Sequence, residues 1–470
     1  MEPHTLMQIG VLILGFYMAW NIGANDVANA MGTSVGSKAL TLKKAVFLAA
    51  ILEFSGAYFV GGGVSETIQK GIVEPSIFQS DPMIFVFGMM GALLATGGLL
   101  QLASYFGLPV STTHAIVGAV LGFGLCIGGV GAIHWDGLSW IVSSWILSPL
   151  LSGVISYSIF SLVQKKILFA LDPIEASQRL TPFLVFACFA ILTLSVVYHG
   201  LNLNLSLSNA VWIASSIGLL AALVSRPFVM RINAPQLQLG GAFHPYQAVS
   251  LEKALHHLQR VHLSNRNTSY SKEISQILIR VQSLNDTVKK TTPGLYSSNH
   301  YQGVEKIFVL LQILSASLVA FAHGANDVAN AIGPVSAVLG VLKTNTVAST
   351  STIPSWLLAL GGGGIVIGLA TWGWRVIETI GKKITELTPT RGFCAEFGAA
   401  LTILLASKLG LPISTTHALI GAVFGVGMAR GLKALNLQMI KEIVISWIVT
   451  IPLCALFSII AFYLLKFCLS

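Results

Sequence analysis

One stretch of eight residues occurs twice in the chain and divides it into two matching halves. Residues 23–30 and 324–331 both read Gly-Ala-Asn-Asp-Val-Ala-Asn-Ala. Each copy lies late in an apolar run of helix length, where an Asn-Asp pair and a second Asn are costly unless they bind something. The identity of the two copies predicts that both halves supply matching parts to one site.

The composition decides which class of protein carries this repeat. The chain has 470 residues, of which 54% are hydrophobic and 10% charged, and its mean hydropathy is +0.78. Soluble domains carry about 25% charged residues, whereas apolar runs of the roughly 20 residues that cross a bilayer recur here along the whole length. Strands of a β-barrel would alternate polar and apolar residues. We therefore expect an all-α polytopic membrane protein.

The basic residues predict how the chain crosses the membrane. The net charge of +9 could suggest nucleic acid, but lysine and arginine fall between the apolar runs, where they mark cytoplasmic loops. Lys38, Lys43 and Lys44 follow the first motif run, which places that loop inside and the N-terminus outside. Carried along the chain, the rule places the C-terminus outside and starts the second motif run from the inside. The halves are thus expected to be inverted-topology repeats, an arrangement typical of secondary transporters.

Three parts follow from this topology. Residues 1–225 form an N-terminal membrane repeat, 226–305 a basic cytoplasmic connector, and 306–470 a C-terminal inverted membrane repeat. In the connector, apolar residues from Leu251 to Val261 and from Ile274 to Leu284 have roughly helical spacing, which predicts one or two amphipathic helices. In total we expect about 10–12 membrane segments, in a multi-pass plasma-membrane protein, with the bacterial cell inner membrane preferred.

A second repeated motif supplies hydroxyl groups. Residues 107–115 read Gly-Leu-Pro-Val-Ser-Thr-Thr-His-Ala, and residues 410–418 differ by one Ile for Val. Gly-x-Pro breaks an apolar run, and Ser-Thr-Thr then occupies the first turn of a new helix. The unpaired N–H groups of that turn, with its hydroxyls, make an anion-binding cradle. The predicted anion-binding residues are Ser111, Thr112, Thr113, Ser414, Thr415 and Thr416. Whether runs 83–133 and 392–429 form full spans or re-entrant hairpins stays open.

The Asn-Asp-x-x-Asn motif suits a cation. Asn25 and Asn29 are four residues apart and share a helix face, with Asp26 beside them. Carboxylate and amide oxygens are hard ligands for Na⁺ and similar ions. Helix–helix hydrogen bonding by buried polar residues is the alternative reading.

Charge balance connects the two motifs. Neither contains Lys or Arg, so two buried aspartates would repel a bound anion. The conflict disappears if cations bind with the anion, or if the anion shares a proton with a carboxylate. The sequence thus favours cation-coupled symport, and phosphate over sulfate, because phosphate retains a proton at neutral pH.

Two further acids and two histidines complete the candidate site. Glu53 and Glu396 lie in apolar runs, and we interpret them as coupling-ion residues. They are not equivalent in the repeat: Glu396 matches Leu93, and the stretch Gly361–Gly364 answers to Glu53. His114 and His417 follow the hydroxyls and are expected to orient them rather than to carry protons. No metal is expected beyond Na⁺.

With both motifs doubled, the chain resembles the inorganic phosphate transporter family over roughly residues 10–165 and 305–468. The resemblance implies a phosphate symporter driven by Na⁺ or H⁺, commonly dimeric, with broken helices or re-entrant hairpins and no organic cofactor. It implies that Asn25, Asp26, Asn29, Asn326, Asp327 and Asn330 contribute to the phosphate and cation sites. The hydroxyls of 111–113 and 414–416 would hold phosphate, and Glu53 and Glu396 match glutamates needed for transport.

Two alternatives belong to other classes. An anion channel could use the same cradle, although buried acids line anion pores poorly. An intramembrane aspartyl hydrolase could use Asp26 and Asp327 as acid and base, but this leaves the hydroxyl cradle unexplained. We therefore expect a transporter with alternating access, and not an enzyme.

Overall fold

The computed structural model describes residues 3–170, 172–200, 205–232, 270–291, 299–347, 353–377, 388–431 and 437–469, with a few positions between 251 and 262. This described part is helical and contains no β-strand, only one isolated bridge between Val73 and Ile133. The α-helices are α1 (Pro3–Gly36), α2 (Leu42–Val60), α3 (Gly62–Lys70), α4 (Pro82–Tyr105), α5 (Thr112–Phe123), α6 (Trp135–Val163), α7 (Pro173–Ser195), α8 (Leu207–Met230), α10 (Ser271–Thr291), α11 (Asn299–Thr344), α12 (Ser355–Thr371), α14 (Pro389–Lys408), α15 (Thr415–Arg430) and α16 (Leu437–Leu469). Short 3-10 or π turns are η1 (Pro75–Phe78), η2 (Gly124–Gly128), η3 (Val130–Ala132), η4 (Gln164–Leu168) and η5 (Val196–Gly200).

Many of these helices are long and apolar enough to cross a bilayer. The described residues contain seven such helices, and an eighth if α2 and α3, which are bent by 69° at Gly61, count as one broken span. The helices Thr112–Gly128 and Ser355–Thr371 are shorter and apolar. The predicted class, an all-α polytopic membrane protein with broken helices, is confirmed.

The chain separates into two compact units. One contains residues 1–161, 183–223 and 308–470, and the other contains 162–182 and 224–307. Helix α10, in the second unit, covers the predicted helical segment from Ile274 to Leu284. The segment from Leu251 to Val261 lies partly outside the described residues. The division at 225 and 305 into repeats and a cytoplasmic connector stays a prediction.

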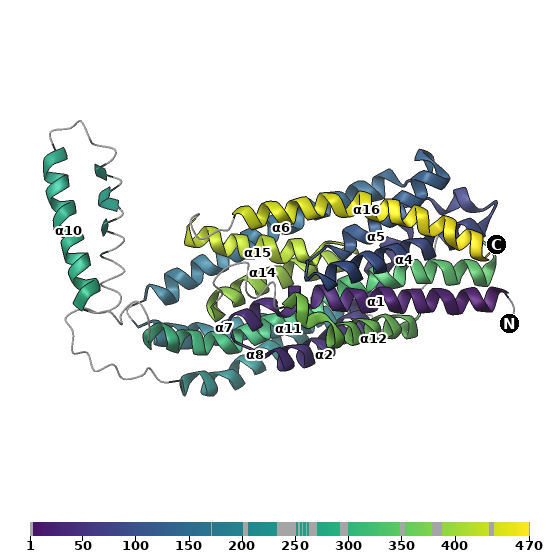
Figure 1. Ribbon diagram of the computed structural model, residues 1–470. Coiled ribbons are helices and arrows are strands. Elements are labelled where there is room, and N and C mark those ends of the chain that lie inside the picture. Colours follow the sequence, from purple (N-terminus) through teal and green to yellow (C-terminus); the bar gives the residue numbers. More distant parts are fainter. Residues whose placement is uncertain are drawn as a thin grey trace. The chain divides into compact units, whose positions relative to one another are not determined.

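Helices α1 and α11 carry the repeated motif through the first unit (Figure 1). Helix α12 packs against α1 and α2, and α16 packs against α4 and α5. Glycine permits the closest approaches. A Cβ on Gly23 of α1 would lie 1.9 Å from the carbonyl oxygen of Ile365, and one on Gly324 of α11 would lie 2.0 Å from that of Glu53. Small residues allow such backbone contact between membrane helices.

The same pattern recurs one turn away. A Cβ on Gly56 of α2 would lie 2.0 Å from the carbonyl oxygen of Phe321, and one on Gly368 of α12 would lie 1.8 Å from that of Trp20. Phe321 and Trp20 stand at the same position before the two motif copies. The pair α1–α12 thus repeats the pair α11–α2, which is consistent with the expected repeat.

Each hydroxyl motif lies between two helices that pack against each other. Helices α4 and α5 are joined by residues 106–111, and α14 and α15 by residues 409–414. Gly107 and Gly410 have φ angles of 65° and 66° in these joints, a conformation that glycine adopts without steric cost. The two stretches therefore form helical hairpins with matching tips.

Candidate functional site

The first Asn of each motif holds the hairpin tip of its own half. Asn25 Nδ2 donates to the carbonyl of Leu108 at 3.0 Å, and Asn25 Oδ1 accepts from the backbone N–H of Val110 at 3.2 Å. Asn326 Nδ2 donates to the carbonyl of Leu411 at 3.1 Å. These side chains satisfy backbone groups that the Gly-x-Pro break leaves without helical partners. A cation-binding role for Asn25 and Asn326 stays a prediction.

The second Asn of each motif reaches the hydroxyl motif of the opposite half. Asn29 Nδ2 donates to Thr416 Oγ1 at 2.8 Å. Asn330 Nδ2 lies 3.3 Å from Thr112 Oγ1 and 3.2 Å from Thr113 Oγ1. All five side chains are buried. The structure therefore brings both copies of both motifs into one site, as their duplication predicts.

The serines of the hydroxyl motif cap the new helices. Ser111 Oγ accepts from the backbone N–H of His114, and Ser414 Oγ from that of His417, both at 3.2 Å. This is the N-cap arrangement expected at the start of α5 and α15. With the caps in place, the threonine hydroxyls lie at the helix N-termini, where the helix dipole favours negative charge.

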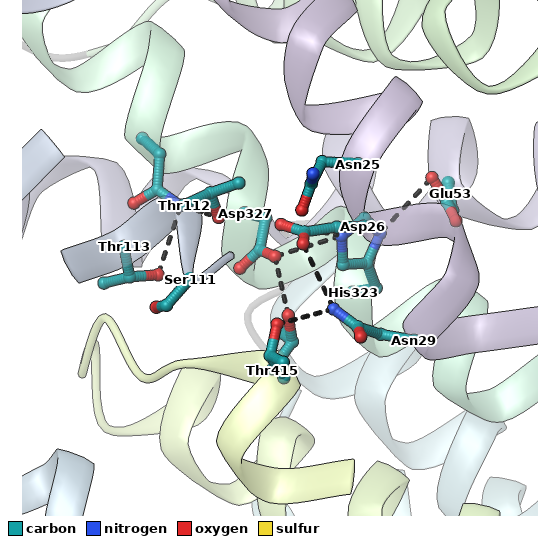
Figure 2. A network of polar contacts seen from close by, with 12 residues as sticks. Asn25, Asp26, Asn29, Glu53, Ser111, Thr112, Thr113, His323, Asp327 and Thr415 are labelled. Carbon is teal, nitrogen blue, oxygen red and sulfur yellow. Dashed lines mark hydrogen bonds and ion pairs between the residues drawn. The ribbon is translucent and has the colours of Figure 1, made fainter. Parts of the chain in front are cut away.

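The two aspartates lie at the centre, between the hairpins (Figure 2). Asp26 Oδ1 accepts from Asn29 Nδ2 at 3.1 Å, and Asp327 Oδ2 accepts from Thr415 Oγ1 at 2.9 Å. Several buried acceptors around them have no hydrogen-bond partner: Asp26 Oδ2, Asn29 Oδ1, Asp327 Oδ1, Asn326 Oδ1, Asn330 Oδ1 and both carboxylate oxygens of Glu53. Buried oxygens without donors are costly. A hard cation would satisfy them.

The residue that the sequence reasoning missed is His323. Its Nε2 lies 3.0 Å from Asp327 Oδ2 and 3.9 Å from Asp26 Oδ2, while its Nδ1 lies 3.3 Å from Glu53 Oε2 (Figure 2). Ligand atoms of Asp26, His323 and Asp327 all lie within 4.8 Å of one another. A signal was available, because His323 interrupts an apolar run directly before the motif and ionisable residues inside membrane helices are functional candidates.

Glu53 joins the aspartates through His323. Its counterpart in the repeat needs correction: the backbone contacts of Gly324 with Glu53 and of Gly23 with Ile365 make Ile365 the equivalent residue, one position after the glycine run Gly361–Gly364. The motif alignment misplaced it because the segment before α12 is longer than the one before α2. The expectation that Glu53 has no acidic counterpart is unaffected.

Glu396 has a polar environment of its own. Its Oε1 accepts from Ser34 Oγ at 2.7 Å and from Gln312 Nε2 at 3.3 Å, and also from the Thr33 hydroxyl. Its Oε2 accepts from Ser315 Oγ. The carboxylate is fully buried and thus sits in a cluster of oxygen-bearing side chains from α1, α11 and α14.

The two motif histidines meet each other. The ring centroids of His114 and His417 are 4.4 Å apart, and the His114 ring lies 3.9 Å from that of Trp145 on α6. His417 Nδ1 lies 3.5 Å from the carbonyl oxygen of Trp145. Both rings are buried beside the first turns of α5 and α15. A role in orienting the neighbouring hydroxyls stays a prediction.

The site combines groups that suit an anion with groups that suit a cation. Two helix N-termini bring threonine hydroxyls from opposite halves, and the unpaired oxygens of the aspartates and motif amides supply acceptors between them. Donors suit a tetrahedral oxyanion, and oxygen acceptors suit a hard cation. The hydroxyl groups and the carboxylates are in direct contact. An anion and a cation bound at these groups would therefore neutralise each other's charge.

The chain is similar to known proteins over almost its whole length. The model of the family described as "Phosphate transporter family" matches residues 22–458. A Chlamydia pneumoniae protein described as a phosphate permease is 46% identical over 465 residues, covering 97% of this chain and 98% of the relative. The chloroplastic inorganic phosphate transporter 2-1 of Arabidopsis thaliana is 44% identical, covering 97% of this chain and 71% of the relative.

A solved structure is also similar. The structure titled "The sodium-dependent phosphate transporter" has a TM-score of 0.81 and 37% sequence identity, and the match covers 98% of this chain and 99% of that chain. These relatives are described as transporters and permeases, so the expectation that the chain is not an enzyme is confirmed and the hydrolase alternative is excluded. The chain belongs to the phosphate transporter family.

Proposed function

We propose that the chain is a secondary active symporter that moves inorganic phosphate across the membrane with a coupling cation, by alternating access. The observation that carries this proposal is the buried acceptor cluster around Asp26 and Asp327, which directly adjoins the hydroxyl-bearing N-termini of α5 and α15. An anion alone would be repelled by these carboxylates. A phosphate bound together with a cation would not.

Phosphate is held between the two hairpin tips. The proposed phosphate-binding residues are Asp26, Asn29, Ser111, Thr112, Thr113, Asp327, Asn330, Ser414, Thr415 and Thr416. The threonine hydroxyls and first-turn N–H groups donate to phosphate oxygens, and an aspartate accepts the proton that hydrogen phosphate carries. Sulfate has no such proton at neutral pH and leaves the acceptor unpaired, so it is discriminated against.

Na⁺ is the proposed coupling ion in preference to H⁺. The proposed cation-coupling residues are Asn25, Asp26, Glu53, Asn326, Asp327 and Glu396, of which Glu396 lies in the separate cluster described above. Several of their side-chain oxygens have no donor nearby, which suits a small hard cation. The similar solved structure is titled as a sodium-dependent phosphate transporter, and this supports the same choice here.

The proposed alternating access would involve the contacts that cross between the halves. The amides of Asn29 and Asn330 each reach the opposite hydroxyl motif, and Thr113 Oγ1 donates to the carbonyl of Ile413 at 2.9 Å. If the contacts of one hairpin tip with the opposite half break while those of the other tip persist, one hairpin opens and the second stays closed. The Asn25 and Asn326 anchors keep each tip on its own motif helix during this motion.

Uptake into proteoliposomes tests the proposal. Purified protein reconstituted at fixed internal composition should accumulate labelled phosphate under an inward Na⁺ gradient, with an H⁺ gradient imposed in a parallel series. Labelled sulfate serves as the matched anion. Uptake that ignores both gradients, or that treats sulfate and phosphate alike, contradicts the proposal.

An anion channel remains the competing function because the same hydroxyl cradle could line a pore. The two differ in thermodynamics: a symporter accumulates phosphate above its external concentration at the expense of the Na⁺ gradient, whereas a channel only equilibrates it. The enclosed, acceptor-rich centre around Asp26 and Asp327 favours the symporter.

The cellular setting is proposed on the sequence pattern. We place the protein in a bacterial inner membrane with both termini outside and residues 226–305 in the cytoplasm, because basic residues concentrate on the proposed inner side. A homodimer is proposed from the family resemblance. Protease protection of terminal tags in oriented vesicles tests the topology, and light scattering of the purified protein tests the dimer.

A further inference from the structure

A pocket of about 140 Å³ lies beside the second hairpin, between α2, α7 and α14. All the residues that line it belong to the first compact unit. The volume far exceeds what one water molecule needs, and an apolar wall gives water no hydrogen-bond partners. Six of the lining residues are apolar: Val60, Ile191, Leu194, Leu401, Leu404 and Leu405.

One end of the pocket is polar and basic. Ser195 and Tyr198, at the end of α7 and in η5, line this end together with Lys408, the last residue of α14. Lys408 Nζ lies 5.1 Å from the centroid of the Tyr198 ring, so the two helix ends meet here. Within the described part of the chain, no ion pair includes Lys408. An exposed positive charge therefore stands at the mouth of an apolar pocket.

This basic end lies where a membrane surface is expected. Pro173–Tyr198 and Leu207–Met230 are consecutive helices long and apolar enough to cross a bilayer, so Tyr198 ends a span. Tyrosine and lysine gather at this level because their polar tips reach the headgroups while their apolar stems stay in the hydrocarbon. Ile191 and Leu194 precede Tyr198 on the same span, and the apolar wall therefore extends from this surface into the hydrocarbon.

We propose that the pocket binds one anionic phospholipid, with its headgroup phosphate at Lys408 and an acyl chain along the apolar wall. Both parts of such a lipid find a complementary surface at the correct depth. A free phosphate ion would use only the basic end and leave the apolar wall uncovered. A zwitterionic lipid carries its own cation in the headgroup, which offsets the attraction to Lys408.

The bound acyl chain braces the second hairpin. Leu404 belongs to a buried cluster that also contains Phe321 of α11 and Ile413 of the hairpin tip. Val60 and Ile191, which line the pocket, pack against the same cluster. A chain in the pocket extends this packing, and burial of its methylene groups stabilises the folded protein.

Thermal unfolding of the detergent-purified protein tests the proposal, in micelles doped with phosphatidylglycerol or with phosphatidylcholine. A lipid that binds the folded state raises its stability by mass action. Half-maximal stabilisation should need about fivefold less phosphatidylglycerol than phosphatidylcholine, the preference expected from one basic residue beside an anionic headgroup. Equal stabilisation by both lipids, or none by either, overturns the proposal.

Replacing the lysine should abolish the preference. Lys408→Gln should raise the phosphatidylglycerol concentration for half-maximal stabilisation about fivefold and leave the phosphatidylcholine value within about twofold. Lys408→Arg keeps the charge and should keep the preference. The matched control is Lys343→Gln, which removes an exposed lysine from the last turn of α11 and should change neither value. An equal loss of preference in Lys343→Gln would mean that the lipid responds to overall charge, which contradicts a site at Lys408.

Filling the pocket tests the place of the acyl chain. Leu405 lines the pocket and is 44% exposed, so the larger ring of Leu405→Trp can enter without displacing the buried cluster. This variant should raise the half-maximal concentration of both lipids about tenfold, because it excludes methylene groups of the chain. Leu102, at the same position of the first hairpin, is 56% exposed, and Leu102→Trp should have no such effect. Equal shifts in the two variants, or none in Leu405→Trp, contradict an acyl chain in this pocket.

Inorganic phosphate distinguishes a lipid site from a site for the free anion. Without added lipid, stabilisation by inorganic phosphate should have the same midpoint in wild type and in Lys408→Gln. A shift with inorganic phosphate and none with phosphatidylglycerol would assign Lys408 to the free ion and overturn the lipid site. Lipid binding is measured here without transport, so failure of the proposed symport leaves this test intact.

Discussion

The two halves of the protein agree in their motif amides, aspartates and threonines, and differ in their other buried ionisable side chains. The motif amides and the threonine hydroxyls occur in both halves and make corresponding hydrogen bonds. The acid–imidazole pair of Glu53 and His323 occurs once, opposite Ile365 and Ile22. Phosphate is close to symmetric and can be shared by two like cradles. A coupling ion needs no symmetry.

The cluster around Glu396 is a second polar group that occurs in only one half. Its partners are Thr33, Ser34, Gln312 and Ser315. The corresponding residues of the other half are Leu93 for Glu396 itself, then Pro334, Val335, Val11 and Leu14 for its partners, all of them apolar. An entire polar cluster is therefore present in one repeat and replaced in the other, which is why we assign the unmatched acids to coupling.

The largest effect is expected from replacing the aspartate that both halves contain. Asp26→Asn and Asp327→Asn should each lower Na⁺-driven phosphate uptake at least about a hundredfold, or roughly 2.7 kcal/mol, because a neutral amide lacks the negative charge that balances the cation and is a weaker acceptor for the phosphate hydroxyl. Initial uptake rates in proteoliposomes give the effect, and gel filtration shows that the variant is folded. Near wild-type uptake in either variant would remove that aspartate from the site.

The next largest effect is expected from replacing Glu396, which only one half contains. Glu396→Gln keeps the shape and part of the hydrogen bonding, so it should reduce Na⁺-driven uptake about tenfold while exchange of internal for external phosphate persists. Leu93→Met at the matching position keeps its volume and should have little effect. Equal loss of exchange and of driven uptake would assign Glu396 to phosphate instead.

A smaller effect is expected at the matched hydroxyls. Thr112→Ala and Thr415→Ala should raise the phosphate KM about fivefold each, corresponding to about 1 kcal/mol for one hydrogen bond. Thr415→Ser retains the hydroxyl and should restore most of the affinity. If both alanine variants keep the wild-type KM, the hydroxyls do not hold phosphate.

The smallest effect should be the same in both halves. Gly107→Ala and Gly410→Ala place a side chain at φ angles of 65° and 66°, and each should destabilise the folded protein by about 1 kcal/mol. Thermal unfolding in detergent measures this, with Gly98→Ala, which meets open space, as the control. Clearly unequal losses would show that the two tips are not structurally equivalent.

The sequence was informative about the parts that occur in duplicate. A repeated polar octapeptide in an apolar run predicted one shared site, and a repeated Gly-x-Pro-x-Ser-Thr-Thr predicted new helices with Ser-Thr-Thr in the first turn. The structure shows both, with Ser111 and Ser414 as caps. Local rules sufficed here because helix breaks and caps depend on a few neighbouring residues.

The parts that occur once were harder to place. His323 looked like an isolated residue before a glycine, and its contacts with Glu53 and Asp327 join helices α2 and α11. The partners of Glu396 come from α1 and α11, far away along the chain. No local pattern reports such contacts, because they depend on how the helices pack.

The sequence by itself thus determined the helical membrane class, the family, and the residues that both halves bring to the centre, because hydropathy, helix breaks and duplication are written in local order. Only the tertiary structure decided that Glu53 reaches the aspartates through His323, and that Ile22 and Ile365 occupy the matching contact. Helices pack closely where they carry glycines, and this packing decides which side chains come into contact. It joins residues that are far apart in the sequence.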